Sequence, residues 1–294
     1  METPSADIAD QHIEDAEVIF GGVTPEQFPR AKSLKWIQTG GAGVERILAR
    51  VPALIESDVI LTNARGAGAP IIGEHAVALM LALGRQFLRF NQNFRDKCWD
   101  PKGALEVVEF IGDKTVGIIG FGKSGRETGW RCKALGMRVL AIDAQPVDGD
   151  PIVEDVWGLY RLPDLLKESD YVVITVPYTK NTHGMIGEEE LKMMKKTARI
   201  IVVSRGGIVD QVALIKALRE GTIAGAGLDT VRPEPMTPDD PLFEAPNLII
   251  TPHIAGNAEQ ELLDRRSFVI FAENLRRYQK NYPLLNVVGK RRGY

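Results

Sequence analysis

Residues 115–126 read Thr115-Val-Gly-Ile-Ile-Gly-Phe-Gly-Lys-Ser-Gly-Arg126, and this stretch decides the fold. An apolar run of strand type is followed by glycines at 120, 122 and 125, in the spacing Gly-x-Gly-x-x-Gly. A helical pattern comes next, and a second apolar strand pattern follows at 138–142. Glycines with this spacing between a strand and a helix predict a Rossmann unit that binds a dinucleotide.

Each of the three glycines has a physical task in such a unit. Gly120 permits the tight turn, Gly122 lets the backbone approach a pyrophosphate, and Gly125 lets the helix pack close to the strand. Asp143 lies 18 residues beyond Gly125, near the position where an acid accepts hydrogen bonds from ribose hydroxyls. Its charge would repel a 2′-phosphate, so the sequence predicts NAD in preference to NADP. The alternative is a plain α/β turn with a surface aspartate.

Short apolar runs alternate with helical patterns along the rest of the chain, which is typical of an α/β protein with a parallel sheet. The expected strands are 115–119, 138–142, 171–176, 199–203, 223–228 and 248–251, with helices at 124–136, 163–168, 187–195 and 210–220. Numbered along the chain, these strands predict one doubly wound sheet in the order 3-2-1-4-5-6. We therefore expect residues 70–256 to form an NAD-binding Rossmann domain.

A second, smaller domain is expected from residues 1–69 together with the C-terminal stretch 257–294. Three strand patterns stand at 16–20, 34–38 and 58–62. Residues 74–87 read as a helix that is apolar nearly all round. Such a helix must be buried, either in a domain junction or in a subunit interface.

Composition argues against several classes of protein. The formal net charge is −3 and the pI about 5.9, so nothing favours a nucleic-acid partner. The longest apolar stretch, 76–83, is far too short to span a bilayer. Cys98 and Cys132 form no motif and suit a reducing compartment. We expect a cytoplasmic protein with no metal site and no membrane partner.

Three polar side chains follow three successive expected strands. Arg205 comes after strand 199–203, Glu234 lies in the loop after 223–228, and His253 follows 248–251. Ligands of open α/β sheets bind beyond the carboxyl ends of the strands, so these side chains should face the nicotinamide half of the cofactor. Taken singly, they read as a surface salt bridge, a solvated loop residue and a turn cap. Their coincidence at three strand ends favours a functional site.

The chemistry of the three residues suits hydride transfer to a 2-keto acid. Arg205 offers a fork of donors that binds a carboxylate and polarises the adjacent carbonyl. His253 can give or take the proton of the C2 hydroxyl, and Glu234 beside it would fix its tautomer and favour the imidazolium. The glycine-rich loop 40–43 could form an anion-binding nest, although a flexible turn is equally compatible with it.

The stretches TVGIIGFGKSGR, SRGGIVD, GLDTVRPEP and TPHIAG resemble the D-isomer-specific 2-hydroxyacid dehydrogenase family, as do LKWIQTGGAGVE and PIIGEHAVALMLAL. Members of this family reduce 2-keto acids with NAD(P)H in a cleft between two domains, usually as homodimers. The resemblance implies Arg205 for the substrate, and His253 as acid and base with Glu234 as its partner. It implies that backbone N–H groups of Ala42, Gly43 and Val44 hold the carboxylate, and that helix 74–87 lies in the dimer interface. It further implies a cofactor lining that includes Lys123, Ser124, Pro177, Thr182, Val203 and Asp229.

The sequence departs from the family pattern in two places. Asparagine usually stands three residues before the arginine, and here that position is Val202. Family members also begin with a further strand–helix–strand segment ahead of the equivalent of Ala16–Phe20, which implies a truncated flavodoxin-like small domain with an open sheet edge. A mis-set start codon, a naturally short subgroup and coverage by a partner chain are all compatible with this departure.

The sequence therefore predicts an oxidoreductase that transfers a hydride between NAD(H) and a small D-2-hydroxy acid or its 2-keto counterpart. The alternative is an NAD(H)-sensing scaffold that gates protein binding, as the corepressor members of the family do, with little or no turnover. The intact set of Arg205, Glu234 and His253 favours the enzyme. The identity of the acid, the direction of the reaction and the effect of Val202 stay open.

Overall fold

The computed structural model describes residues 10–153 and 155–291. They divide into two compact units: unit 1 comprises the described residues of 1–68 and 257–294, and unit 2 is Ala69–Gly256. The first nine residues of the expected small domain lie outside the described part. The expected α/β architecture is confirmed, because each unit combines a parallel sheet with helices.

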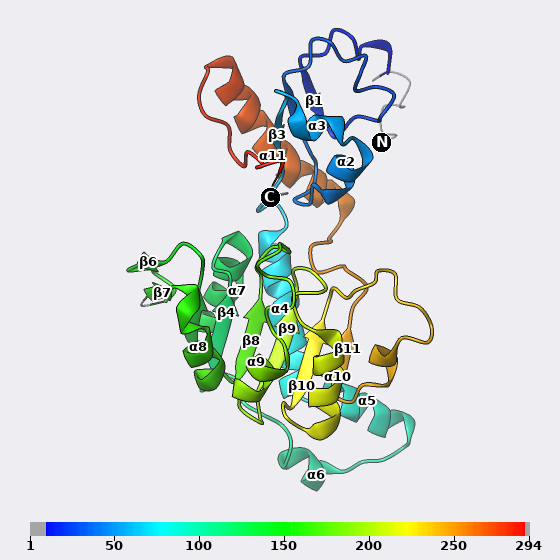
Figure 1. Cartoon of the computed structure of the whole chain (residues 1–294). Coiled ribbons are helices and arrows are strands. Elements are labelled where there is room, and N and C mark those ends of the chain that lie inside the picture. Colours follow the sequence, from blue (N-terminus) through cyan, green and yellow to red (C-terminus); the bar gives the residue numbers. More distant parts are fainter. Residues whose placement is uncertain (1–9, 154, 292–294) are drawn as a thin grey trace. The chain divides into compact units, whose positions relative to one another are not determined.

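Unit 2 contains an eight-stranded sheet in the order β11-β10-β9-β8-β4-β5-β7-β6 (Figure 1). Its strands are β4 Thr115–Ile119, β5 Arg138–Ile142, β6 Val147–Asp148, β7 Asp155–Trp157, β8 Tyr171–Ile174, β9 Arg199–Val202, β10 Gly225–Leu228 and β11 Leu248–Ile250. All neighbours pair in parallel except β6 and β7, which are antiparallel. The central strands β8, β9 and β10 are buried at every residue, as expected of strands covered on both faces.

The expected position of the third strand is wrong. Strand 171–176 was expected beyond the second strand, but β8 pairs directly with β4, on the side of β4 opposite to β5. The third place belongs to β7, which pairs with β5. With β7 in that place the order 3-2-1-4-5-6 holds, and β11 extends it by one strand. β7 has three residues, of which only Val156 is buried, so it leaves no apolar run in the sequence.

Helices cover both faces of this sheet, and two apolar cores lie beneath them. On one face pack α8 Leu162–Glu168, α9 Glu188–Met193 and α10 Gln211–Glu220. On the other face pack α4 Ala69–Gly84 and α7 Lys123–Ala134. The connecting segments contain α5 Phe87–Arg95, α6 Pro101–Leu105, η1 Leu159–Arg161 and η2 Pro241–Glu244.

The apolar helix α4, expected over 74–87, begins five residues earlier, at Ala69, and ends three residues earlier, at Gly84. It packs against α7 and against β9 and β10. Gly73 permits this approach, since an added Cβ there would lie 2.9 Å from the Glu127 carbonyl carbon of α7. One side of α4, with Ala76, Leu79, Met80 and Leu83, is therefore buried in the core of unit 2.

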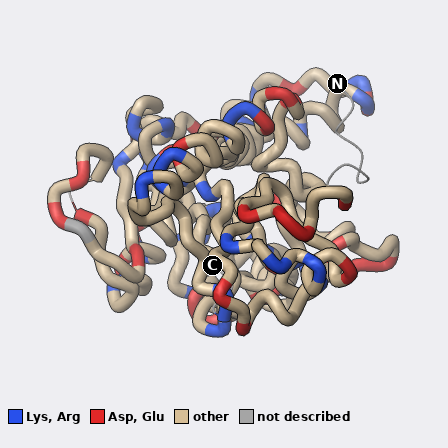
Figure 2. Tube along the Cα trace, turned by 90° about the horizontal axis from the view of Figure 1, so that it is seen from above, with Lys and Arg blue, Asp and Glu red and all other residues tan. Residues whose placement is uncertain are grey.

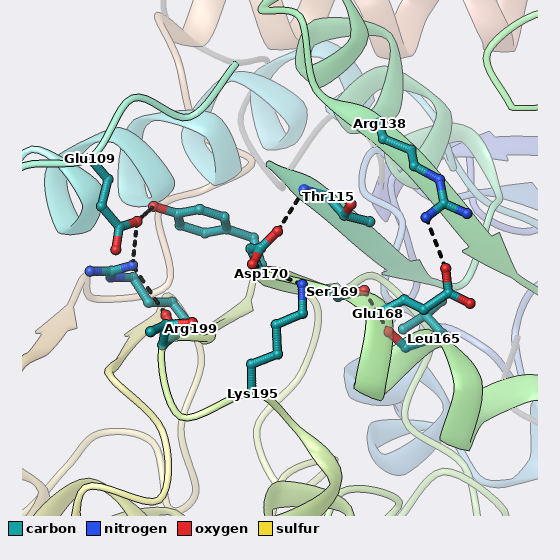
Figure 3. Close-up of polar contacts among 11 residues, drawn as sticks. Glu109, Thr115, Arg138, Leu165, Glu168, Ser169, Asp170, Lys195 and Arg199 are labelled. Atoms are coloured by element: carbon teal, nitrogen blue, oxygen red, sulfur yellow. Dashed lines mark hydrogen bonds and ion pairs between the residues drawn. The ribbon is translucent and has the colours of Figure 1, made fainter. Parts of the chain in front are cut away.

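The amino ends of the strands carry a network of ion pairs and hydrogen bonds (Figure 3). Arg199, whose side chain is 6% exposed, donates through Nη1 to Glu109 Oε2 at 2.8 Å. The Tyr171 hydroxyl donates to the same oxygen at 3.3 Å, and burial raises its pKa. Asp170 accepts from the Thr115 N–H and from Lys195 Nζ, both at 2.9 Å. The network ties the segment before β4 to strands β8 and β9.

Unit 1 contains a three-stranded parallel sheet in the order β1-β2-β3. Its elements are β1 Val18–Phe20, β2 Trp36–Gln38, β3 Ile60–Thr62, α2 Glu45–Arg50, α3 Ala53–Glu56 and α11 Gln260–Gln279. One face of the sheet buries Ile37 and Leu61 against the core of this unit. On α11, the rings of Phe271 and Tyr278 each lie 5.5 Å from the ring of Trp36.

Charges of both signs are interspersed along the trace (Figure 2). In the part of the chain that the structure describes, no single helix is long and apolar enough to cross a membrane. α4 and α5 together reach the required length only with a bend of 58° between them.

Candidate active site

The glycine turn after β4 leaves open space at one of its three glycines. Gly120 has φ +93°, and an added Cβ there would lie 2.7 Å from Val176 Cγ1. A Cβ on Gly125 would lie 2.1 Å from the carbonyl oxygen of Gly120. The fold itself therefore requires both glycines. A Cβ on Gly122 would meet no protein atom within 4 Å, so this glycine fits the close approach of a ligand such as the pyrophosphate of NAD.

Asp143 follows β5 and is hydrogen-bonded to the glycine turn. Its Oδ2 accepts the N–H of Phe121 at 2.7 Å, and its Oδ1 accepts the N–H of Gln145 at 3.0 Å. The carboxylate is half-buried beside the first turn of α7. Lys123 is exposed and Ser124 half-buried in that turn. This arrangement places a negative charge where the ribose of a dinucleotide is expected.

Two of the other expected cofactor residues shape the loop after β8, and a third belongs to the core. The Thr182 hydroxyl donates to the carbonyl oxygen of Pro177 at 2.6 Å and accepts the N–H of Thr179 at 2.8 Å. Val203 is 4% exposed and follows β9 directly. Pro177 itself is exposed at the surface of unit 2.

Glu234 and His253 are brought into direct contact by the loops after β10 and β11. His253 Nδ1 lies 2.7 Å from Glu234 Oε2, and the second carboxylate oxygen, Oε1, accepts the N–H of Val231 at 2.9 Å. An ionised carboxylate can only accept, so Nδ1 carries the proton and Nε2 is left to exchange one with a ligand. The imidazole is 47% exposed. The pair has the geometry of an oriented acid–base group.

Arg205 lies in the turn that follows the neighbouring strand β9, three residues beyond the last residue of that strand. Its Nη1 donates to the carbonyl oxygen of Ser204 at 2.8 Å, and the residue is half-buried. Gly206 brings this turn against the loop that carries Glu234, since an added Cβ would lie 2.0 Å from the carbonyl oxygen of Val231. Gly207 follows with φ +81°. Close packing at Gly206 and the positive φ at Gly207 therefore favour glycine at both positions after the arginine.

A small pocket of about 10 Å³, room for one water molecule, is lined by the Arg205 turn. Val202, the departure from the family pattern, lines this pocket together with Thr230. Thr230 is 3% exposed, and its hydroxyl has no hydrogen-bond partner within the described ranges. An amide at position 202 would offer polar atoms to the same pocket, so the valine removes polarity beneath the arginine without changing the strand.

Asp229 ties the loop that carries His253 to the end of β10. Its side chain is 1% exposed, and it accepts the Thr251 hydroxyl at 2.6 Å and the N–H groups of Ile254 and Ala255 at 2.8 Å. Its carbonyl oxygen accepts the N–H of His253 at 2.8 Å. The carboxylate is thus used within the protein, and its contribution to a cofactor site is to shape this loop.

The expected carboxylate-binding residues belong to unit 1, in the loop between β2 and α2. Ala42 and Gly43 are exposed, and Val44 is buried. The carbonyl oxygens of residues 40 to 42 each accept an internal hydrogen bond, from Ser267, Thr39 and Asn63 respectively. Among the described residues, the backbone N–H groups of 40–44 have no acceptor. The loop therefore presents donors, as an anion-binding nest requires.

His75 is a site neighbour that the sequence patterns did not identify. It lies on α4, and its Nε2 is 2.9 Å from Thr251 Oγ1 and 3.6 Å from Asp229 Oδ1. An ionisable residue inside an apolar helix was the available signal. Across residues 10–153 and 155–291, no three His, Cys, Asp or Glu side chains gather as metal ligands.

Comparison with known proteins identifies relatives of this chain. Residues 77–255 match the family described as "D-isomer specific 2-hydroxyacid dehydrogenase, NAD binding domain". The chain is 34% identical to a glyoxylate reductase of Korarchaeum cryptofilum, over 98% of this chain and 87% of that protein. It is 36% identical to a D-3-phosphoglycerate dehydrogenase of Archaeoglobus fulgidus over 90% of this chain, and spans about half of that protein's length, 49%.

A solved structure gives the same result for the fold. The D-isomer specific 2-hydroxyacid dehydrogenase of Xanthobacter autotrophicus Py2, in complex with NADPH and MES, matches with a TM-score of 0.82. The sequences are 29% identical, and the match covers 96% of this chain and 86% of that one.

Proposed function

The chain belongs to the D-isomer specific 2-hydroxyacid dehydrogenase family, and from this premise we propose that it transfers a hydride between NAD(H) and a small D-2-hydroxy acid or its 2-keto counterpart. The observation that carries the proposal is the 2.7 Å contact between His253 Nδ1 and Glu234 Oε2 at the ends of adjacent strands. Because Glu234 holds the proton on Nδ1, the other nitrogen, Nε2, is available for the substrate oxygen.

In the direction of reduction, each group has one task. NADH supplies the hydride that adds to C2 of the keto acid. His253 donates its Nε2 proton to the carbonyl oxygen, which becomes the hydroxyl, and Glu234 stabilises the imidazolium from which that proton leaves. Arg205 binds the carboxylate and polarises the carbonyl, as a planar fork of donors does. Within unit 1, the free N–H groups around Ala42, Gly43 and Val44 support our assignment of this loop to anion binding.

NAD is the cofactor of the matched domain, and we propose that NAD(H) is preferred over NADP(H). Asp143 supports this preference, because a carboxylate beside the turn accepts ribose hydroxyls and repels a 2′-phosphate. We assign Gly120, Gly122, Lys123, Ser124 and Gly125 to the phosphate side of the site. We assign Pro177, Thr182, Val203 and Asp229 to the loops around it.

The substrate is proposed as a short acid. The relatives act, by name, on glyoxylate and on D-3-phosphoglycerate, so both an unsubstituted and a phosphorylated acid belong in the test. Arg205 would serve all these substrates in the same way, because each carries a carboxylate next to the reacting carbon.

A homodimer in the cytoplasm completes the proposal. The proposed interface is formed by the helix around 74–87, in which several apolar residues are only partly buried within unit 2. The segment that follows α4 supplies large exposed apolar side chains at Phe87, Leu88, Phe94, Trp99, Leu105 and Phe110. Apolar surface of this extent is typical of an association site. Gel filtration of the wild type and of Phe94→Asp tests this part: the variant should elute later, as a monomer.

The test of the activity is turnover by purified protein. NADH oxidation is followed with glyoxylate, hydroxypyruvate, pyruvate and longer 2-keto acids, and NAD reduction with D-3-phosphoglycerate. We expect turnover with at least one acid, and a loss of kcat of about 10²- to 10⁴-fold in His253→Ala. His12→Ala, which changes an exposed histidine of unit 1, is the matched control.

Absence of turnover with every acid, combined with intact NADH binding, would contradict the enzyme and favour the NAD(H)-sensing scaffold. That scaffold should change its oligomeric state or its partner binding when NADH is added. The bonded His253–Glu234 pair has no task in such a scaffold, which is why we favour the enzyme.

A further inference from the structure

His75 is an ionisable residue in an apolar helix, so its position requires a physical explanation. It stands on α4, whose other inward-facing residues are apolar, and its side chain is 20% exposed. A polar group in such surroundings is unfavourable unless it is hydrogen-bonded. Its partner is the hydroxyl of Thr251, the residue that follows β11 and opens the loop of His253.

The direction of the hydrogen bonds follows from the acceptor at the end of the chain of contacts. Asp229 Oδ1 lies 2.6 Å from Thr251 Oγ1, and an ionised carboxylate only accepts, so Thr251 donates its single proton there. Thr251 Oγ1 must then accept from His75 Nε2 at 2.9 Å. His75 therefore carries a proton on Nε2. The three side chains form one chain of hydrogen bonds that runs from His75 through Thr251 to Asp229.

Asp229 connects this chain of hydrogen bonds to the backbone around the acid–base residue, His253. Asp229 also binds the N–H groups of Ile254 and Ala255, and its carbonyl oxygen binds the N–H of His253. His253 has φ +55°, in the left-handed region that is unfavourable for a residue with a side chain. A residue is held in such a conformation only when its surroundings over-determine it. The bonds to Asp229, on both sides of His253, do this.

We propose that His75 is a positioning residue for His253: by holding the Thr251 hydroxyl on Asp229, it maintains the loop conformation that sets the imidazole against Glu234. The inference rests on the proposed function, because it assumes that His253 exchanges the proton of the reaction. A histidine that only anchored α4 would contribute to stability and leave the chemistry unchanged.

The test separates these two roles with His75→Leu, which removes the donor, and His75→Gln, which retains one. Glu74→Gln is the matched control, because Glu74 is the exposed neighbour on the same helix. Four quantities are measured: kcat, KM for the keto acid, the primary isotope effect with deuterated NADH, and the melting temperature. We expect His75→Leu to lower kcat by about tenfold or more with little change in KM, since small misplacements of reacting groups reduce rates strongly.

The isotope effect should rise in His75→Leu, because proton and hydride transfer become slower than product release. His75→Gln should recover most of kcat, and Glu74→Gln should behave as the wild type. A His75→Leu protein with unchanged kcat and isotope effect and a lower melting temperature would overturn the inference.

Should His75→Leu fail to fold, the same question is put to Thr251. Thr251→Val removes the hydroxyl at nearly constant shape, and Thr251→Ser retains it. The inference requires the valine variant to lose clearly more kcat than the serine variant, and equal losses would contradict it. A wild type without turnover would contradict the proposed function instead, which is a different outcome from an active wild type matched by His75→Leu.

Discussion

Glu234 Oε2 and His253 Nδ1 lie 2.7 Å apart although 19 positions separate the two residues in the chain. The contact exists because β10 and β11 are adjacent and parallel, so that their following loops leave the sheet at the same edge. We expect Glu234→Gln to lower kcat by about 10²-fold, because the amide cannot stabilise the imidazolium by charge. Steady-state kinetics with NADH and the best keto acid measure this.

The control for that variant is Glu244→Gln, which alters an exposed glutamate of the same region. It should leave kcat unchanged. A Glu234→Gln enzyme with wild-type kcat would show that the carboxylate does not assist His253.

Gly122 and Gly125 should respond differently to the same substitution. A methyl group on Gly125 would meet the Gly120 carbonyl oxygen at 2.1 Å, so Gly125→Ala should lose about 1–3 kcal/mol of unfolding free energy. Gly122→Ala meets no protein atom and should unfold as the wild type does, while its KM for NADH rises several-fold. Urea unfolding and NADH titration separate the two effects, and an unchanged KM in Gly122→Ala would argue against pyrophosphate at this turn.

Asp143→Asn should lower the preference for NADH over NADPH by about tenfold, the effect of removing one charge contact. Asparagine retains one oxygen that can accept the Phe121 N–H, so the glycine turn is preserved, while the charge and the bond from the Gln145 N–H are lost. The measurement is kcat/KM for NADH divided by kcat/KM for NADPH, in wild type and variant. A wild type that prefers NADPH would show that Asp143 is misinterpreted.

The ion pairs at the amino ends of the strands should differ in strength. Glu109→Gln leaves the buried Arg199 guanidinium without its carboxylate and should cost about 3 kcal/mol of unfolding free energy. Glu168→Gln breaks the exposed pair with Arg138, which is worth less than about 1 kcal/mol. Denaturant unfolding of both variants measures the difference. Equal losses would mean that burial does not control the strength of these pairs.

Alkaline pH should lower the free energy of unfolding through the ionisation of Cys132. Burial raises the pKa of this thiol from its ordinary 9.0 to about 12. Above pH 9 the unfolded chain releases the proton while the native state keeps it, so unfolding becomes easier by about 1.4 kcal/mol for each pH unit up to pH 12. The advantage of the wild type over Cys132→Ala in unfolding free energy should therefore shrink between pH 8 and 10.5. Cys98→Ala, at an exposed site, should show no such trend.

Much of unit 2 could be predicted because its strands are buried on both faces. β8 and β9 are apolar runs with every residue buried, and they stand out from any neighbouring pattern. Arg205 was identified for the same reason, because a charge directly after such a run is conspicuous. β7 could not be identified, because its pairing with β5 is stabilised by main-chain hydrogen bonds and a single buried valine.

His75 and Thr230 show a second limit. The contact of His75 with Thr251 joins residues 176 positions apart, and no periodicity within a helix encodes its partner. Thr230 follows a buried strand like Arg205, yet it carries a small hydroxyl that resembles its apolar neighbours in shape. Its lack of a partner, and its place beside Val202, emerge only when β9 and β10 are set side by side.

The loop between β2 and α2 has a consequence for how such a protein evolves. Its carbonyl groups are engaged by Thr39, Asn63 and Ser267, whereas its N–H groups have no acceptor among the described residues. Preference for an anion at this loop would then be independent of the side chain at position 42, which is exposed, whereas Val44 is buried in the core of unit 1. Under the proposed function, drift at position 42 would alter the size and polarity accepted in a substrate and leave the preference for a carboxylate intact. Libraries that aim at new substrates should vary position 42 and spare Val44 and the three side chains that anchor the loop.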